Sequence, residues 1–241
     1  MQVIIRIISA TFIATICISL CFGNYLFAQD NIDNKIILLT DHFPPLSYQN
    51  EKGEFIGTAD KIIHKLFKNA NLHYQIKSYP WKRALQMVSK QEDVLIYPLS
   101  RTENREDDYV WITPLFSLKI KTYGLTKPNA TFDITKGNHQ FACIKTTINC
   151  LAVNSLKIPE SALSEISNIS TVQLVKMVAK KRVDFIMMTE IEFEYAIKIL
   201  NLDRKTFTKI EKYNYVATDY LAASKGFDQD IIEKIKAAVT N

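Results

Sequence analysis

The chain has 241 residues, a formal net charge of +5 and 47% hydrophobic residues. This length allows one large or two small domains with a proper core, and because the positive charge is spread along the chain it argues against nucleic-acid binding. After the N-terminal segment, no stretch approaches the 18 apolar residues that indicate a transmembrane helix.

Residues 1–28 have the pattern of a signal peptide. Arg6 is their only charge, and an apolar run extends from Ile7 to Phe22. We expect cleavage after Ala28, which supplies the small residue that signal peptidase prefers, and export to the periplasm. The alternative is an uncleaved anchor, although the run is shorter than the roughly 20 residues that span a bilayer.

Apolar runs and helical periodicity alternate after the signal peptide, as an α/β protein requires. In the first half the pattern predicts a strand at 35–40, a helix at 59–69, a strand at 74–77, a helix at 81–89 and a strand at 94–97. These elements make a βαβαβ unit, and the natural ligand position lies beyond the carboxyl ends of its strands.

The second half repeats this alternation with different residues. It predicts a strand at 141–144, a helix beginning near 147–151, a helix at 171–180, a strand at 183–188, a helix at 190–200, strands at 208–212 and 220–223, and a helix at 228–239.

The strand at 94–97 is followed by Ser100, Thr102 and Arg105. An Arg side chain matches a carboxylate with parallel N–H donors, and hydroxyl groups add further donors to the same oxygens. Two aromatic segments upstream, 41–48 and 79–83, can supply flat apolar walls. Together these segments predict a pocket for a small carboxylate.

Taken in order, these segments resemble the bacterial periplasmic solute-binding proteins of the polar amino-acid type, extracellular family 3. The shared features are the strand 35–40, the turn Pro44-Pro45-x-Ser47-Tyr48, Gly53 and Gly57 before a helix, and Thr102-x-x-Arg105 followed by Trp111, Pro114 and Leu115. The resemblance implies a two-lobed type 2 periplasmic-binding fold, in which each lobe is a mostly parallel sheet flanked by helices.

The resemblance also implies a discontinuous first lobe and two hinge connections. The expected parts are the signal peptide at 1–28, the first lobe at 29–117 and 217–241, the second lobe at 118–216, and hinges at 115–119 and 215–219. Two lobes around a cleft suit hinge closure on a ligand.

By this resemblance Arg105 binds the ligand carboxylate, and Ser100 completes the contact. The alternative for Arg105 is a surface pair with Glu106 or Asp107. Phe43 and Trp81 stand where the family sandwiches the ligand, although an aromatic residue after a strand is more often part of the core.

Tyr48 is a further candidate, with packing beneath its turn as the alternative. In the second lobe, Thr147 is expected to contact the carboxylate at a turn where Thr146 replaces the usual Gly. Amino-acid binders commonly place an Asp after the strand at 183–188, but here Thr189 and Glu190 follow it. Either Glu190 pairs with the ligand ammonium, or the ligand lacks that group.

Cys143 and Cys150 remain after cleavage, in a compartment that permits disulfides. A bridge between them would close a strand-to-helix turn, and two separate buried thiols are the alternative. The four His residues are scattered, so we predict no metal and no cofactor.

The resulting functional prediction is a monomeric periplasmic protein, not an enzyme, that captures an amino acid or related small carboxylate. Its partner would be an inner-membrane ABC permease, with no nucleic acid involved. A ligand sensor without transport is one alternative, and a cyclohexadienyl-dehydratase-like enzyme on the same fold is another. For such an enzyme, Glu190 and Asp41 are the candidate acids.

Overall fold

The computed structural model describes residues 35–127, 133 and 139–240. The predicted signal peptide at 1–28 lies outside the described residues. The described residues from Ile36 onward form one compact unit.

The first group of elements, which we call the first lobe, contains the predicted βαβαβ unit. Its elements are β1 (Ile36–Thr40), β2 (Tyr48–Gln49), β3 (Phe55–Ile56), α2 (Thr58–Asn69), β4 (Tyr74–Ser78), α3 (Trp81–Lys90), β5 (Val94–Ser100), η1 (Glu103–Arg105), α7 (Gln229–Ala237) and η5 (Ala238–Thr240). Helix α2 forms because Ile63, Leu66 and Phe67 recur at helical spacing, and all three side chains are buried.

The second group, which we call the second lobe, also alternates strands with helices. Its elements are β7 (Phe141–Ile144), α4 (Ile148–Asn154), η3 (Glu160–Ala162), β8 (Leu163–Ile166), α5 (Thr171–Ala179), β9 (Phe185–Thr189), α6 (Glu190–Leu200) and η4 (Arg204–Thr206). Strand β9 is buried along its whole length, as expected for an interior strand covered on both faces. Strand β8 is an element that the sequence pattern does not predict.

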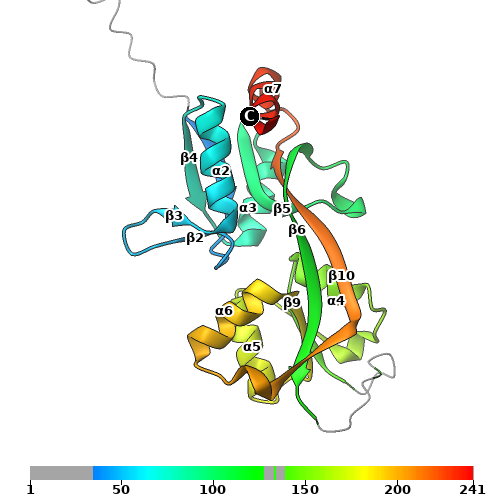
Figure 1. Ribbon diagram of the computed structural model, residues 1–241. Helices are drawn as coiled ribbons and strands as arrows, with labels where there is room; N and C mark the ends of the chain where they lie inside the picture. The colour runs from blue at the N-terminus through cyan, green and yellow to red at the C-terminus, as the bar shows by residue number, and fades with distance from the viewer. Residues whose placement is uncertain (1–34, 128–132, 134–138, 241) are drawn as a thin grey trace, which may run out of the picture. The chain divides into compact units, whose positions relative to one another are not determined.

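Two long strands, β6 (Val110–Leu125) and β10 (Phe207–Ala223), run side by side through the sheet (Figure 1). The strand order is β4-β1-β5-β10-β6-β9-β7-β8. Strands β4, β1 and β5 are parallel to one another, and so are β9, β7 and β8, while β10 and β6 pair in antiparallel fashion.

The predicted α/β fold is confirmed, with one difference in how the sheets connect. The parallel parts of the two lobes belong to one hydrogen-bonded sheet, because β10 pairs with β5 of the first lobe, β6 pairs with β9 of the second lobe, and β10 and β6 pair with each other. Residues 208–212 and 220–223, predicted as separate strands, both lie in β10. The segments expected as hinges are adjacent, since Val216 pairs with Lys119 and Ala217 with Leu118.

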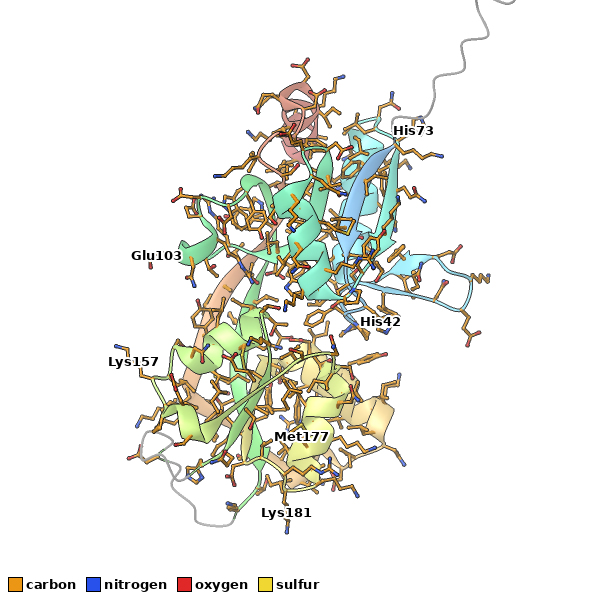
Figure 2. All side chains as sticks on the ribbon, turned by 180° about the vertical axis from the view of Figure 1, so that it is seen from behind. His42, His73, Glu103, Lys157, Met177 and Lys181 are labelled. Carbon is orange, nitrogen blue, oxygen red and sulfur yellow. A yellow bond between two sulfur atoms is a disulfide. The ribbon has the colours of Figure 1, made fainter. Side chains whose placement is uncertain are left out.

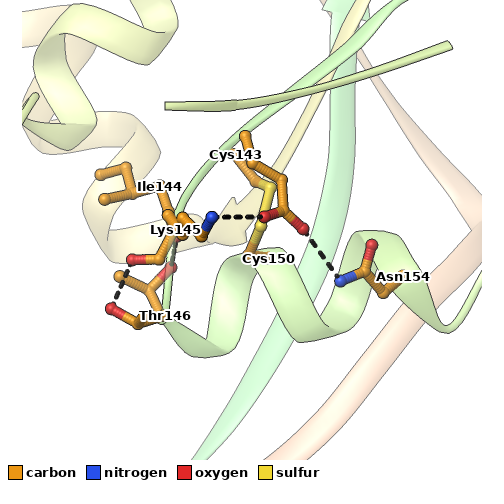
Figure 3. The surroundings of a disulfide bond; sticks show 8 residues. Cys143, Ile144, Lys145, Thr146, Cys150 and Asn154 are labelled. Atoms are coloured by element: carbon orange, nitrogen blue, oxygen red, sulfur yellow. Dashed lines mark hydrogen bonds and ion pairs between the residues drawn. A yellow bond between two sulfur atoms is a disulfide. The ribbon is translucent and has the colours of Figure 1, made fainter. Parts of the chain in front are cut away.

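A disulfide joins Cys143 in β7 to Cys150 in α4, which confirms the predicted pairing (Figure 3). The Cα atoms are 4.9 Å apart. The carboxylate of Glu165 lies close to both sulfur atoms, but sulfur atoms in a disulfide are not thiolate ligands for a metal. The bridge therefore fixes the turn that carries Thr146 and Thr147.

Among the described residues, no helix is both long enough and apolar enough to cross a membrane.

Candidate functional site

A cavity lies where the carboxyl ends of β1 and β5 meet the first residues of α4, α5 and α6. Its volume is about 800 Å³ when space open to solvent is counted. It is lined by Asp41, His42, Phe43, Pro44, Trp81, Pro98, Ser100, Arg105, Leu118, Ile144, Thr147, Ile148, Ile169, Ser170, Thr171, Glu192 and Asp219. Figure 2 shows His42 at the end of the first lobe that faces the second lobe.

Arg105 is the only Arg or Lys among these lining residues. Its guanidinium donates to the Ser100 carbonyl at 3.1 Å and to the Thr146 carbonyl of the second lobe at 2.9 Å. Burial lowers the pKa of Arg105 from its ordinary value, although an Arg remains charged in proteins. The guanidinium has five N–H donors, so it can take a carboxylate in addition to these carbonyls. The alternative pairing of Arg105 with Glu106 is not seen, because Glu106 pairs with Arg101.

Asp219 in β10 is only 3% exposed and faces the same cavity. Strand pairing brings it opposite Ser100, whose hydroxyl donates to its carboxylate. The pKa of Asp219 is raised to about 7, mainly by burial and also by the nearby Glu192, while Ser100 and Arg105 act against the increase. A cation in the cavity would favour the ionised form of this carboxyl group.

Glu192 reaches the cavity from the first turn of α6 and is 1% exposed. One carboxylate oxygen accepts from the Thr189 N–H at 2.9 Å and from the Thr189 hydroxyl at 2.5 Å. The other accepts from the Asn149 amide at 3.5 Å. Burial raises the pKa of Glu192, and these donors act against the increase.

Asp41 is the third carboxylate of the cavity. It follows β1 and accepts hydrogen bonds from the backbone N–H groups of His42 at 2.7 Å and Trp81 at 3.2 Å. Burial raises its pKa, and both N–H groups lower it. Because Trp81 opens α3, this bond ties the end of β1 to the start of that helix. Phe43 and Trp81 both line the cavity near this carboxylate.

The turn between β7 and α4 brings Thr147 to the cavity. Its hydroxyl donates to the Ile144 carbonyl at 2.7 Å, which closes the turn. Thr146 has a φ of 69°, in the left-handed region that favours Gly. The conformation expected from a Gly-containing turn is therefore present here with a β-branched residue, which stores backbone strain.

Three predicted contact residues do not line the cavity. Glu190 lies on the surface, with its side chain 53% exposed and 3.6 Å from the Lys121 ammonium. Thr189 donates to Glu192, and the ring of Tyr48 lies 6.3 Å from that of His42.

Five predicted residues do line the same cavity, namely Arg105, Ser100, Trp81, Phe43 and Thr147. Their contacts with a ligand stay predictions. Sequence reasoning missed Asp219 and Glu192. A signal for Glu192 existed, because Thr189-x-x-Glu192 is a capping box that aims the Glu side chain back over the helix start.

The fold is shared with solved structures of amino-acid-binding proteins. The structure resembles that of the arginine-, lysine-, histidine-binding protein ArtJ from Geobacillus stearothermophilus, with a TM-score of 0.72, 18% identity and 86% and 88% of the two chains covered. It also resembles Tv2483 bound to L-arginine, with a TM-score of 0.70, 17% identity and 89% and 87% covered. The fold is therefore that of the type 2 periplasmic-binding proteins.

A histidine kinase sensor domain with similarity to periplasmic binding proteins has the same fold, with a TM-score of 0.72, 12% identity and 86% and 89% of the chains covered. Residues 36–149 match the family model of the bacterial extracellular solute-binding proteins, family 3. An arginine-binding periplasmic protein of Mannheimia haemolytica is 28% identical over 130 residues, which are 54% of this chain and 49% of that protein. The match thus spans about half the length of that relative.

Proposed function

We propose that the chain is a periplasmic receptor for an amino acid with a cationic side chain. The observation that carries the proposal is the charge pattern of the cavity, in which Arg105 faces the same space as three carboxyl groups, those of Asp41, Glu192 and Asp219. A ligand with one carboxylate and two cationic groups complements this pattern, because buried charges are stable only when they are paired.

Arg105 is the proposed partner of the ligand carboxylate. Its planar donors match a carboxylate bidentately, and Thr147 lines the cavity in the second lobe. The Thr146 carbonyl already accepts from Arg105 at 2.9 Å, so a carboxylate bound here would lie at a contact between the lobes.

Glu192 and Asp219 are the proposed partners of the ligand α-ammonium. The charge of Glu192 raises the pKa of Asp219, so the two carboxyl groups interact across the cavity. Two buried carboxylates repel each other unless a proton or a cation lies between them. An ammonium group would relieve this repulsion, and this role replaces the one that the sequence assigned to Glu190.

Asp41 is left as the proposed partner for a cationic side chain, with Trp81 and Phe43 as apolar walls. Aromatic faces attract cations as well as planar groups. One protein that shares this fold is named for binding arginine, lysine and histidine. The relative that matches over about half of its length is named for arginine.

Export and delivery complete the proposal. A signal peptide at 1–28 would send the chain to the periplasm as a monomer, where it would pass its ligand to an ABC permease in the inner membrane. The segments 115–119 and 215–219, which pair with each other in the sheet, would act as the hinge between lobes 29–117 with 217–241 and 118–216. The sensor domain of the same fold makes ligand sensing without transport the second candidate function.

Calorimetric titration of the mature protein with a matched set of compounds tests the binding proposal. L-Arginine and L-lysine should bind, agmatine should lose the Arg105 contact, 5-guanidinopentanoate should lose the ammonium contacts, and L-glutamine should lose the contact with Asp41. Binding of glutamine or glutamate in preference to arginine would contradict the proposed cationic side chain. No binding by any amino acid would contradict the receptor proposal.

A further inference from the structure

Asp60 lies outside the cavity lining but is fully buried at the start of α2. One of its carboxylate oxygens accepts from the Ser47 hydroxyl at 2.7 Å and from the Tyr97 hydroxyl at 2.9 Å. The other accepts from the Tyr48 N–H at 3.4 Å. A single side chain therefore holds two segments that lie about fifty residues apart in the sequence.

Each of these segments carries part of the cavity wall. Ser47 closes a tight turn with Phe43, since the Phe43 N–H donates to the Ser47 carbonyl at 2.6 Å and the Ser47 N–H donates to the Phe43 carbonyl at 3.0 Å. Phe43 and Pro44 in this turn line the cavity. On the other side, Tyr97 is followed directly by Pro98, which also lines the cavity.

The same network reaches the end of β1. The Thr40 hydroxyl donates to the Ser47 hydroxyl at 3.1 Å, and Thr40 is fully buried. The residue after Thr40 is Asp41, one of the cavity carboxylates. Three separate pieces of the first-lobe wall are thus joined through Asp60.

Close approach of α2 to the turn makes these bonds possible. The Ala59 N–H donates to the Leu46 carbonyl at 2.9 Å. At Gly57, where φ is 149°, an added Cβ would lie 2.2 Å from the Leu46 carbonyl oxygen and 3.0 Å from the Asp60 carboxylate. Only glycine fits this position, so the turn and the helix start are held against each other by the backbone as well as by Asp60.

We propose that Asp60 is a positioning residue for the solute site. It sets the place of the turn at 43–48 relative to the end of β5, and so fixes the spacing of the aromatic wall and the cavity residues Pro98 and Ser100. The proposal rests on the proposed function of the cavity, although Asp60 itself does not line it.

The chemistry of the network indicates which substitutions separate positioning from folding. Asp60→Ala would leave the hydroxyls of Ser47 and Tyr97 buried without their acceptor, which favours displacement of both segments. Asp60→Asn keeps one carboxyl-type oxygen that can accept from both hydroxyls. Asp60→Asn should therefore keep most of the ligand affinity that Asp60→Ala loses.

Ser224 supplies a matched control in the same lobe. It is 1% exposed, and its hydroxyl donates to the Val94 carbonyl at 3.2 Å and accepts from the Val94 N–H at 3.4 Å. Val94 begins β5, whereas Tyr97 and Ser100 lie nearer its cavity end. Ser224→Ala thus removes buried hydrogen bonds from the first lobe without touching the wall of the cavity.

The experiment measures L-arginine affinity by calorimetry and thermal unfolding for Asp60→Ala, Asp60→Asn and Ser224→Ala, at a temperature where all are folded. We expect at least tenfold weaker binding for Asp60→Ala, and affinity within threefold of the wild type for Asp60→Asn and Ser224→Ala. Unchanged affinity in Asp60→Ala, or an equal loss in Ser224→Ala, would overturn the proposal.

Amide hydrogen exchange, measured without ligand, tests the positioning role of Asp60 independently of the proposed function. In Asp60→Ala, exchange should accelerate in peptides covering 41–48 and 95–100, while peptides of β7 and β9 keep wild-type rates. Uniform acceleration, or none in those two peptides, would refute the positioning role. If the wild type binds no amino acid, the receptor proposal fails, and this exchange pattern still supports or refutes the role of Asp60.

Discussion

Arg105 is the residue on which the proposed carboxylate contact depends. Its guanidinium is partly buried at the cavity and donates to carbonyl groups at 3.1 and 2.9 Å. We expect Arg105→Ala to weaken L-arginine binding by about 10- to 100-fold, because a hydrogen bond to a charged group contributes about 1.5–3 kcal/mol. Calorimetry measures the affinity, and circular dichroism checks that the fold is kept.

Arg182→Ala is the matched control for this change. Arg182 is exposed in the second lobe and does not line the cavity, so its removal lowers the net charge equally without touching the site. If both variants lose affinity to the same extent, long-range electrostatics explains the effect, and the proposal that Arg105 contacts the ligand directly is wrong.

The raised pKa of Asp219 predicts that the stability of the protein depends on pH, and this dependence can be measured without a ligand. Burial raises its pKa in the folded protein to about 7, whereas Asp in an unfolded chain titrates near about 3.9. Between these values the folded state keeps a proton that the unfolded state releases. The contribution of this group to stability therefore falls as pH rises from about 4 to about 7, by about 1.4 kcal/mol per pH unit, and is level above that range.

Asp219→Asn should remove this dependence, because the amide stays neutral and its oxygen can still accept from Ser100. The variant should gain stability relative to the wild type as pH rises from 5 to 8, in urea denaturation at several pH values. Asp93→Asn, at an exposed position, controls for the loss of one acidic group. A difference between Asp219→Asn and wild type that is the same at every pH would contradict the raised pKa.

At the scale of single elements, the disulfide stabilises the turn between β7 and α4. Cys143 and Cys150 are seven residues apart, and a bridge across so short a loop stabilises a protein by about 2–3 kcal/mol in the chain-entropy model. Reduction should lower the melting temperature by about 5–10 °C. It should also weaken ligand binding, because Thr147 and Ile148 lie inside this loop and line the cavity.

Differential scanning calorimetry with and without reductant measures this effect. The Cys143→Ala/Cys150→Ala variant should melt near the reduced wild type and should not respond to reductant. Quantitative labelling of both thiols in the native oxidised protein would show that the bridge is absent.

Local patterns are sufficient to predict the elements whose residues contact mainly each other or one neighbour. The helix expected at 190–200 has those bounds, and the one expected at 59–69 begins one residue earlier, because apolar residues recur there at helical spacing. The long strand β10 is different. Its central residues have no clear alternation, and they are extended because they pair with β6, which is a non-local cause.

The same distinction separates the predicted site residues from those that were missed. Arg105 follows a strand within a recognisable motif, so its place at the cavity can be predicted. Asp219 lies 119 residues from Ser100 in the sequence, and only the pairing of β10 with β5 brings the two together. No local pattern indicates such a contact, whereas the capping box that orients Glu192 is readable in the sequence.

At the scale of the whole molecule, one contact between the lobes lies at the proposed ligand site and another lies outside the cavity lining. Arg105 of the first lobe donates to Thr146 of the second at 2.9 Å, and the rings of Tyr48 and Tyr195 lie 6.5 Å apart. A ligand held by Arg105 on one side and Glu192 on the other would add contacts that exist only when the lobes are close. Such differential contacts shift a hinge equilibrium towards its closed form.

We therefore expect saturating L-arginine to reduce the radius of gyration in small-angle X-ray scattering. Glu192→Gln keeps the size of the side chain but loses its charge, so it should bind more weakly and show less compaction at the same ligand concentration. Because compaction needs contacts from both lobes, ligand saturation seen by calorimetry without a change in radius would contradict closure. Binding would then involve one lobe alone, and the paired strands β6 and β10 would be a rigid connection, not a hinge.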